Sequence, residues 1–525
     1  MSATTIRGKT PLHVLFLRPP RHYWPIINED DNFLLPLAYP TLAAYLRARM
    51  DDVRVEILDC CAQRLGWRSL ARTLAEKRPD VIAIGEKVVY AHEALRAFRL
   101  ARELLPGVVT VGGGHIFSTL PEWSLAECPE LDWIVRFEGE ETLRELLEAL
   151  RAGDDATSVA GIAYRRGGAV VSTTPRQPIA DLDSLPIPAY DLAKLDLYSP
   201  FGQLWPRAVT IQRGRGCIDE CSFCSWWVQE GKHTEVDGRL VHSKFYRSKS
   251  VERVVQEVEL LYEKYGARYL FWVDATWNLD DRWLDAFCSE IIRRDYKLGW
   301  WAFFRTDRVV EQDRKGVLEK MVRAGLRHVL VGVERADTGD VEELEKTGYG
   351  YERTREAFLL LERKYPQVFR QGTFLTGMRH DDERSIKTLL DYAHDCRLDF
   401  AAFHTLTPFP GTPLWDRAHR EGWIEEHDFA KYDMFYPVMP TRHLSRDEVA
   451  RLTTWCQRNF VQRKPLRYLK GLVSRHPIRR RLHWWFLLSI GRILARDAWQ
   501  SLRGAKKFGG FASVNALWKP VWYEA

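Results

Sequence analysis

The chain has 525 residues, which is enough for two to four domains of ordinary size. With 46% hydrophobic and 28% charged residues, its composition excludes a disordered, collagenous or coiled-coil chain. The net charge of +6 is unevenly placed: residues 463–525 hold fourteen Lys and Arg against two acidic residues, so the rest of the chain is acidic overall.

Neither a membrane span nor a secretory signal is visible in the sequence. The longest candidate apolar run, Trp484–Leu488, has five residues, whereas a span needs roughly 18. Met1–Pro11 carries no long apolar segment. The nine cysteines are an odd number without disulfide-framework spacing. We therefore expect a cytoplasmic protein in which clustered cysteines are metal ligands.

Residues 10–151 alternate between apolar strand patterns and amphipathic helices. Strands are predicted at residues 13–17, 53–58, 80–85, 108–112 and 132–136. This alternation predicts a doubly wound parallel sheet, whose ligands bind beyond the carboxyl ends of the strands. The turn Gly112-Gly-Gly-His115 lies at such an end.

A second alternating region follows a stretch rich in Gly, Pro, Ser and Thr. Residues 152–204 are interpreted as a linker with one hairpin. Between residues 205 and 420, strands are predicted at 208–211, 269–273, 300–304, 328–333, 373–376 and 399–403. Six strand–helix units indicate a partial barrel with active groups at the carboxyl ends of its strands. Residues 421–525 are expected to be helical.

The cysteine motif follows the first strand of this second region. Cys217, Cys221 and Cys224 have the spacing C-x3-C-x2-C, which has about a 0.003 chance of arising at random among nine cysteines. Three thiolates on one loop can hold three irons of a cubane cluster and leave the fourth iron open. The alternative is a zinc ion, for which His233 is a candidate fourth ligand.

The cysteine spacing, with Phe223 before the last cysteine, resembles the radical S-adenosylmethionine (SAM) superfamily. The N-terminal half resembles the cobalamin-binding domain often fused to it. Further matching motifs are Pro36-Leu-Ala-Tyr-Pro-Thr-Leu-Ala-Ala44, Gly112–His115, Glu138-Gly-Glu-Glu141, Tyr246-Arg-Ser-Lys-Ser250, Ala324-Gly-Leu326, Gly332-Val-Glu334 and Thr407-Pro-Phe-Pro-Gly-Thr412. The resemblance implies an α/β chain: a Rossmann-like cobalamin-binding domain at 10–151, a (β/α)6 TIM-type radical SAM barrel at 205–420, and a helical basic region at 421–525.

The sequence departs from the family pattern in its cobalamin motifs. Gly112-Gly-Gly-His115 replaces the usual Gly-Gly-Pro-His, and Phe137-Glu-Gly-Glu140 replaces Gly-Glu-Gly-Glu. The motif Asp-x-His-x-x-Gly, through which other cobalamin proteins ligate cobalt, is absent; Asp59–Gly66 stands in its expected place without a histidine. The resemblance then implies a cobalt without a histidine on its lower face, which favours methyl transfer as a radical.

The resemblance also implies roles for the residues at the barrel rim. Cys217, Cys221 and Cys224 would hold a [4Fe-4S] cluster whose open iron binds SAM, and one electron from a flavodoxin or ferredoxin would release a 5′-deoxyadenosyl radical. Asp274 would bind the SAM ammonium, Arg305 the SAM carboxylate as a bidentate fork, and Glu334 a ribose hydroxyl. The alternative for each of these three is an ordinary salt bridge at the rim.

The remaining expected contacts are aromatic or belong to cobalamin. Phe223 would pack beside the adenine or serve as a core aromatic, and Trp226 and Trp227 would shield the cavity from water. Gly112 to Gly114 would let cobalamin approach the backbone, or would form a plain strand-to-helix turn. The full set expected at the cobalamin is Gly112, Gly113, Gly114, His115, Glu138, Gly139 and Glu140.

The resemblance implies a cobalamin-dependent methyltransferase that methylates an unactivated carbon of a large apolar substrate, such as a hopanoid-type lipid or a tetrapyrrole. A second SAM would remethylate the cobalt. The subfamily that this chain resembles most is the hopanoid C-3 methylase. One alternative is the anaerobic Mg-protoporphyrin monomethyl ester cyclase, which oxidises its substrate without methyl transfer. Another is a non-catalytic cobalamin-binding sensor with a degenerate barrel, against which the intact cysteine triad argues.

The basic C-terminal region has three possible interpretations. Residues 479–496 mix cations with Trp, Phe and Leu, which suits an amphipathic helix on an anionic membrane. Nucleic acid also attracts cations, but the tryptophans of residues 463–525 favour a lipid interface; they are Trp484, Trp485, Trp499, Trp518 and Trp522. The third interpretation is a basic helical cap packed on the barrel. We expect a peripheral protein on the inner face of the cell membrane, without a nucleic-acid partner.

Overall fold

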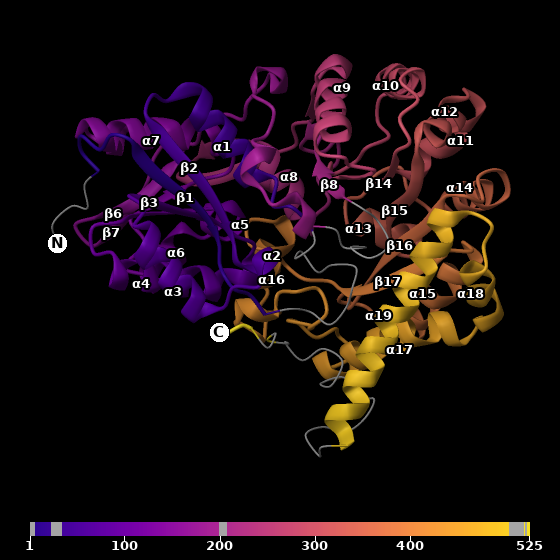
Figure 1. The fold of residues 1–525 in the computed structure, drawn as a ribbon. Coiled ribbons are helices and arrows are strands. Elements are labelled where there is room, and N and C mark those ends of the chain that lie inside the picture. Colours follow the sequence, from indigo (N-terminus) through magenta and orange to yellow (C-terminus); the bar gives the residue numbers. More distant parts are fainter. Residues whose placement is uncertain (1–5, 23–33, 199–206, 503–518, 520–521) are drawn as a thin grey trace.

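The computed structural model describes residues 6–22, 34–198, 207–502, 519 and 522–525, and for parts of residues 489–501 it describes only the backbone. The first sheet lies at the N-terminal end of the molecule (Figure 1). Its strands are β1 (Leu12–Arg18), β2 (Val53–Asp59), β3 (Val81–Gly85), β4 (Val109–Gly113), β5 (Trp133–Val135), β6 (Ile162–Arg166) and β7 (Ala169–Ser172). They run in the order β2-β1-β3-β4-β5-β6-β7, and β1 to β5 are parallel. The doubly wound parallel arrangement is thus confirmed.

Helices cover both faces of this sheet because successive strand residues point to opposite sides. In β1, Val14 and Phe16 pack toward one helical layer, whereas Leu15 and Leu17 pack toward the other. The first layer contains α1 (Ala38–Arg49) and α7 (Glu140–Ala152); the second contains α3 (Trp67–Lys77), α4 (Ala91–Leu104), α5 (Gly114–Thr119) and α6 (Pro121–Glu127), and the short α2 (Cys60–Gln63) follows β2. Burial on both faces explains the nearly continuous apolar runs of these strands.

The segment interpreted as a linker differs in part from that expectation. The hairpin β6–β7 extends the first sheet, because β6 pairs antiparallel with β5 at Trp133–Tyr164 and Val135–Ile162. Ile162 and Ala163 are fully buried, so the hairpin is a true part of the core. Local composition could not reveal this pairing, since Gly- and Thr-rich flanks resemble those of an independent loop.

The second sheet is an open barrel of six parallel strands (Figure 1). They are β8 (Ala208–Ile211), β13 (Tyr269–Trp272), β14 (Gly299–Phe303), β15 (Leu326–Glu334), β16 (Phe369–Thr376) and β17 (Phe400–Thr405). The helices of this half are α8 (Ser225–Glu230), α9 (Val251–Glu259), α10 (Asp281–Arg293), α11 (Thr306–Arg314), α12 (Val317–Ala324), α13 (Thr338–Glu343), α14 (Tyr351–Lys364), α15 (Glu383–Asp395) and α16 (Pro413–Arg420). This half also contains two short two-stranded sheets. One is the hairpin β10 (Lys232–Val236) and β11 (Arg239–Ser243), and the other pairs β9 (Gly214–Arg215) with β12 (Arg247–Ser248). All six predicted barrel strands are present.

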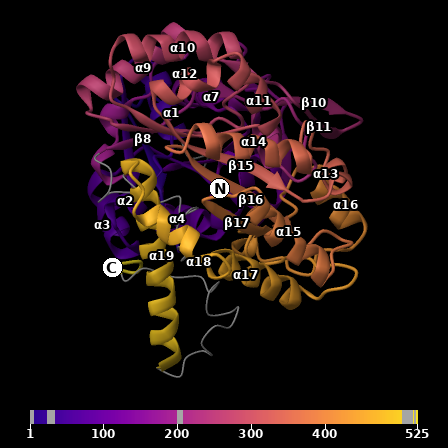
Figure 2. The ribbon, with the colours of Figure 1, turned by 90° about the vertical axis from the view of Figure 1, so that its right-hand side faces the viewer.

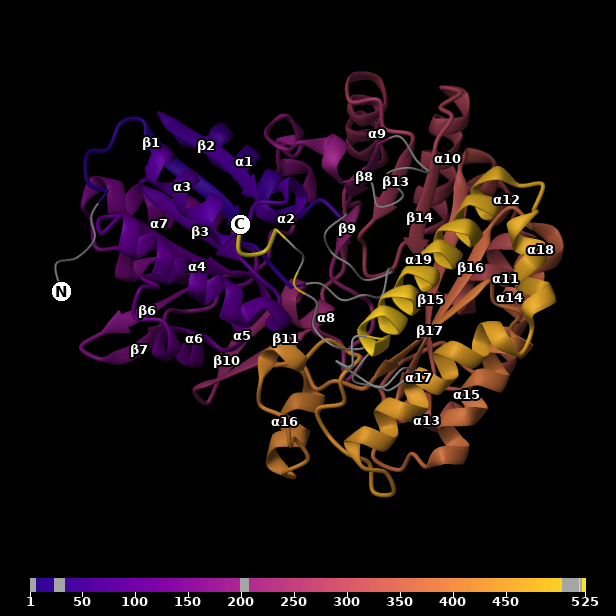
Figure 3. The same cartoon turned by 60° about the horizontal axis from the view of Figure 1, so that its bottom comes forward.

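Two C-terminal helices close the barrel at the amino ends of its strands, α18 (Pro465–Leu472) and α19 (Pro477–Leu502). The preceding helix, α17 (Arg446–Gln462), packs beside α15 and β17. Tyr468, Leu482 and Phe486 form one buried cluster with residues from the starts of the strands, namely Ala208, Tyr269, Phe271, Phe369, Phe400 and Ala402. Figure 3 shows α19 lying across this side of the sheet. The inner face of α19 is therefore the helical cap that the sequence left open as one interpretation.

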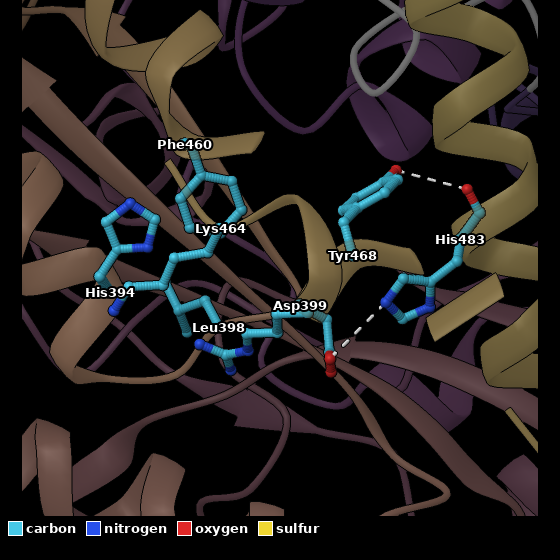
Figure 4. A pocket seen from close by; sticks show the side chains of 8 residues that line it. His394, Leu398, Asp399, Phe460, Lys464, Tyr468 and His483 are labelled. Carbon is cyan, nitrogen blue, oxygen red and sulfur yellow. Dashed lines mark hydrogen bonds and ion pairs between the residues drawn. The ribbon is translucent and has the colours of Figure 1, made fainter. Parts of the chain in front are cut away.

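An ion cluster anchors this cap beside a small cavity (Figure 4). The Asp399 side chain is 2% exposed, and its carboxylate accepts hydrogen bonds from Arg370 Nη2 at 2.9 Å and Arg479 Nη2 at 2.6 Å. His483 Nε2 lies 3.8 Å from the same oxygen, and its backbone oxygen accepts a bond from the Tyr468 hydroxyl. These cations hold the pKa of Asp399 well below its usual range. A single buried carboxylate thus joins β16, β17 and α19.

The last residues of the chain return to the first domain. Trp67 N donates to Tyr523 O at 3.0 Å, and Ser69 N donates to Ala525 O at 2.9 Å. A Cβ at Gly66 would lie 2.0 Å from Trp522 O, so this contact needs glycine. Figure 2 shows the C-terminus beside α3, while α19 belongs to the other half. The tail therefore touches both halves; Trp518 lies outside the described residues.

Candidate functional site

The three motif cysteines lie on one loop between β8 and α8. Cys224 caps α8, and its N–H donates to Cys221 O at 3.0 Å. Trp227 Nε1 donates to the same oxygen, also at 3.0 Å. Burial raises the pKa of all three thiols, that of Cys224 to about 11, so the thiolates need a partner that favours their charge. Iron is such a partner, and three soft thiolates on one rigid loop fit a cubane cluster.

The zinc alternative is not supported by the surroundings of His233. Its ring stacks on Phe137 at 3.5 Å between centroids, and its Nδ1 lies 2.9 Å from His242 Nδ1. Within the described ranges, no three His, Cys, Asp or Glu side chains converge on a single-ion site. A zinc ion requires such convergence, whereas each thiolate of a cubane site binds a different iron.

Asp274 fixes the backbone that leads into the cysteine loop. Its carboxylate accepts hydrogen bonds from Arg213 N at 3.2 Å and from Gly214 N at 2.5 Å. The side chain is 1% exposed, and burial raises its pKa to about 7. This geometry makes Asp274 a positioning residue for the loop, and its contact with the SAM ammonium stays a prediction.

Arg305 joins the end of β14 to the cysteine loop. Its Nη1 donates to Asp219, which lies between Cys217 and Cys221. Its Nε and Nη2 donate to the two oxygens of Asp307 at 3.1 and 2.9 Å. The fork that was expected to bind the SAM carboxylate is thus directed to Asp307. The observed contacts are those of an ordinary salt bridge at the barrel rim, and a contact with SAM stays a prediction.

Glu334 ends β15 beside a lysine that the sequence reading missed. Glu334 has a φ of 64°, and its Oε1 accepts a hydrogen bond from Lys346 Nζ at 2.7 Å. Lys346 also donates to Gly332 O at 2.5 Å. Its ammonium acts against the raised pKa of Cys221 and Cys224, which places positive charge beside the cysteine loop. A lone lysine in a loop has no periodicity or spacing by which sequence alone would single it out.

The aromatic residues of the motif are anchored in different ways. Phe223 packs against an apolar cluster that includes Leu344 and Leu406, as a core aromatic does. Trp227 is buried through its bond to the loop, and the Trp226 ring contacts Phe303 edge-on at 5.5 Å. This contact therefore joins α8, which follows the cysteine loop, to the last residue of β14.

The glycine turn of the first sheet is required by the protein's own packing. A Cβ at Gly112 would lie 2.9 Å from the Phe117 ring, and Gly114, at φ +77°, would meet Glu86 N at 2.7 Å. At Gly113 the nearest atom would be Val135 O at 3.6 Å. The plain strand-to-helix turn thus explains Gly112 and Gly114, whereas Gly113 leaves room for a close approach by a ligand.

His115 stands where the two halves meet. Its ring contacts Phe409 edge-on, with 6.2 Å between the ring centroids, and the backbone of Pro410 lies beside it. Burial lowers its pKa to about 4, and its buried Nε2 has no partner among the described residues. An unpaired buried nitrogen at the carboxyl end of β4 fits a site for a polar ligand.

The acidic motif expected at cobalamin makes ion pairs across the same boundary. Glu140 Oε1 accepts from Arg215 Nη2 at 2.6 Å, and Glu138 pairs with Arg247 and with Arg215. Gly139 caps α7, and its added Cβ would lie 3.2 Å from Val135. The two glutamates bind the cysteine-bearing half, and a direct contact with cobalamin stays a prediction.

Comparison with known proteins matches both halves. The B12 binding domain family matches residues 23–147, and the Radical SAM superfamily matches residues 211–393. An uncharacterised methyltransferase from Pyrococcus horikoshii is 28% identical over 84% of this chain and 90% of its own. The anaerobic magnesium-protoporphyrin IX monomethyl ester cyclase of Cereibacter sphaeroides is 29% identical over 78% of this chain and 64% of its own. The hopanoid C-3 methylase of Methylococcus capsulatus is 25% identical over 78% of this chain and 73% of its own.

Solved structures share the fold. The cobalamin-dependent SAM radical enzyme OxsB aligns with a TM-score of 0.67 at 16% identity, over 94% of this chain and 74% of its own. The methyltransferase TsrM from Kitasatospora setae aligns with a TM-score of 0.62 at 20% identity, over 78% of this chain and 76% of its own. Since the two family matches fall in order on the two sheets, the chain belongs to the radical SAM enzymes with a B12-binding domain, whose cofactors are a [4Fe-4S] cluster, SAM and cobalamin.

Proposed function

We propose that this enzyme transfers a methyl group to an unactivated carbon of a large apolar substrate. The observation that carries the proposal is the junction of the two sites: His115, at the carboxyl end of β4, contacts Phe409 and Pro410, which follow the last barrel strand. Bound at these edges, the cluster with SAM supplies a hydrogen-abstracting radical and cobalamin supplies the methyl group. Methyltransferases among the relatives support this chemistry.

We assign the residues of this chain as follows. Cys217, Cys221 and Cys224 hold the cluster. Asp274 and Arg305 fix the loop that carries these cysteines, through Gly214 N and through Asp219. Glu334, oriented by Lys346, remains the acceptor proposed for a ribose hydroxyl of SAM.

The substrate classes proposed are a hopanoid-type lipid and a tetrapyrrole. Trp226 and Phe303, in contact beside the cysteine loop, offer apolar surface that suits either. The relatives include an enzyme named for each class. Comparison of lipid and pigment extracts from a deletion strain distinguishes the two, because the missing product identifies the class.

Oxidative cyclisation is the second candidate, favoured by the 29% identity to a cyclase. The test uses SAM with a trideuterated methyl group. Methyl transfer leaves the label in the product and forms one S-adenosylhomocysteine with each 5′-deoxyadenosine. Cyclisation leaves the product unlabelled and forms no S-adenosylhomocysteine, which would refute our proposal.

A further inference from the structure

We propose that the outward face of α18 and α19 docks this enzyme on an anionic membrane surface. The proposal is independent of the reaction proposed above. In the described part of the chain, ten large hydrophobic side chains are exposed, and seven belong to this short region. These seven, which we call the outer stripe, are Leu466, Leu469, Val473, Trp484, Leu488, Trp499 and Leu502.

The α19 part of the stripe occupies one side of the helix. At about 100° per residue, Trp484, Leu488, Trp499 and Leu502 fall within an arc of about 60°. Leu482 and Phe486, which close the barrel, lie on the opposite side. The helix therefore presents two apolar faces, one of which is already covered by the protein.

The stripe continues onto α18. Trp484 Nε1 donates to Leu472 O at 3.1 Å, which brings the Trp484 ring beside the end of α18. Val473 follows directly and is 77% exposed; Leu466 is 74% exposed. A surface this apolar, concentrated on two adjoining helices, is typical of an interaction site rather than of scattered exposed residues.

The charge around the stripe selects the partner. Residues 463–502 contain ten Lys and Arg and a single acidic residue, Asp497. Lys470 and Arg475 are exposed, and neither has a carboxylate within 4.0 Å among the described residues. Two copies of such a surface would repel each other, and a nucleic acid would leave the apolar stripe uncovered. An anionic bilayer satisfies both the cations and the stripe.

The placement of α19 suits surface docking. Its inner face stays on the barrel, and Figure 2 shows its far half extending past the rest of the ribbon. Within the described part of the chain, no helix is long and apolar enough to cross a membrane. The proposed contact is therefore a peripheral one, on the side of the barrel where its strands begin.

The test measures co-sedimentation of the full-length holoenzyme with vesicles of phosphatidylcholine alone or with added phosphatidylglycerol. We expect binding to the anionic vesicles that weakens with salt. Lys470→Gln with Arg475→Gln should lower the partition coefficient about 25-fold, since each cation near the surface contributes about fivefold. Leu466→Ser with Val473→Ser should remove most of the binding that persists at high salt.

A matched control uses exposed hydrophobics elsewhere. Val236→Ser with Val241→Ser changes two valines, 51% and 45% exposed, on the β10–β11 hairpin and should leave sedimentation unchanged. Equal binding of the Leu466/Val473 variant and wild type would overturn the proposal, as would equal binding to both vesicle types. A lipid-free dimer that becomes monomeric in the Leu466/Val473 variant would assign the stripe to self-association instead.

Discussion

Arg215, two residues before Cys217, donates a hydrogen bond from Nη2 to Glu140 Oε1 at 2.6 Å. Glu140 lies in the first turn of α7, and its side chain is 5% exposed, whereas that of Arg215 is 11% exposed. The pair therefore connects the cysteine loop directly to the B12-binding domain. Because Glu138 pairs with Arg215 and Arg247, the acidic motif acts as a clamp between the two halves.

Glu140→Gln should weaken this clamp. Losing the carboxylate leaves the Arg215 guanidinium only partly paired in a buried place, which costs about 3 kcal/mol. We expect a lower unfolding temperature and a lower cobalamin content after purification, with iron content retained. Asp191→Asn is the control, because Asp191 pairs with Arg47 on the surface, where an ion pair contributes at most about 1 kcal/mol. Equal effects of both variants would contradict the clamp.

Cys221→Ala should abolish both the cluster and SAM cleavage. Three thiolates are the minimum for a site-differentiated cubane, so the remaining two should retain little iron. Reconstituted wild type should contain about four irons and four sulfides per chain, measured by chemical analysis. Cys288→Ala is the control, because Cys288 is buried in α10, outside the motif. SAM cleavage by Cys221→Ala at the wild-type rate would refute the assignment.

The positions of the strands were predictable, but the contacts between the halves were not. Parallel strands buried on both faces form apolar runs, which is why β8 and β13 to β17 were recognised. Arg215 and Glu140 are 75 residues apart, and no local pattern relates them. The sequence left the role of α19 open for another reason: with Leu482 and Phe486 inward and Trp484 and Leu488 outward, no single face stands out as apolar.

Among the site residues too, those defined by local spacing were predictable and those defined by distant contacts were not. The cysteine spacing predicted the loop, because adjacent ligands are local in sequence. The partners of Arg305 depend on Asp219 in that loop and on Asp307, so its fork could not be assigned from its position at a strand end alone. Lys346 became visible only through its contact with Glu334.

The cobalt should lack a histidine on its lower face. No Asp-x-His-x-x-Gly motif is present, and Asp59 instead pairs with Arg18 and Tyr198. Electron paramagnetic resonance of the bound cob(II)alamin should show no nitrogen superhyperfine splitting, and His115→Ala should give the same spectrum. A nitrogen pattern that disappears in His115→Ala would assign His115 as the ligand and contradict this prediction.

The contact between the two halves at His233 and His242 should become less stable in mild acid. Burial lowers the pKa of His233 to about 3 and that of His242 to about 4, from 6.5. Since the unfolded chain then binds more protons below pH 6.5, the free energy of unfolding decreases as pH falls, by at most about 2 kcal/mol per site at pH 5. The double variant His233→Phe/His242→Phe should reduce this slope between pH 7 and 5 in thermal melts, and the other buried histidines, such as His115, should maintain the remainder. His380→Phe, on the surface, should keep the full slope.

Asp399 should be the residue on which closure of the barrel depends. Asp399→Asn leaves Arg370 and Arg479 without their buried anion, a loss of about 3 kcal/mol that should lower the unfolding temperature of the barrel by about 10 °C. Asp391→Asn is the control, because Asp391 pairs with Arg463 on the surface.

The pH dependence of this closure follows from the lowered pKa of Asp399. Its stabilising effect is complete above the ordinary value of 3.8 and is lost as pH falls toward the lower folded value. The free energy of unfolding of wild type should therefore approach that of Asp399→Asn only in strong acid. Truncation after Gln462 should destabilise the barrel further, because it also removes Leu482 and Phe486 from the cluster at the strand ends. A truncated chain that melts like wild type would show that α19 does not close the barrel.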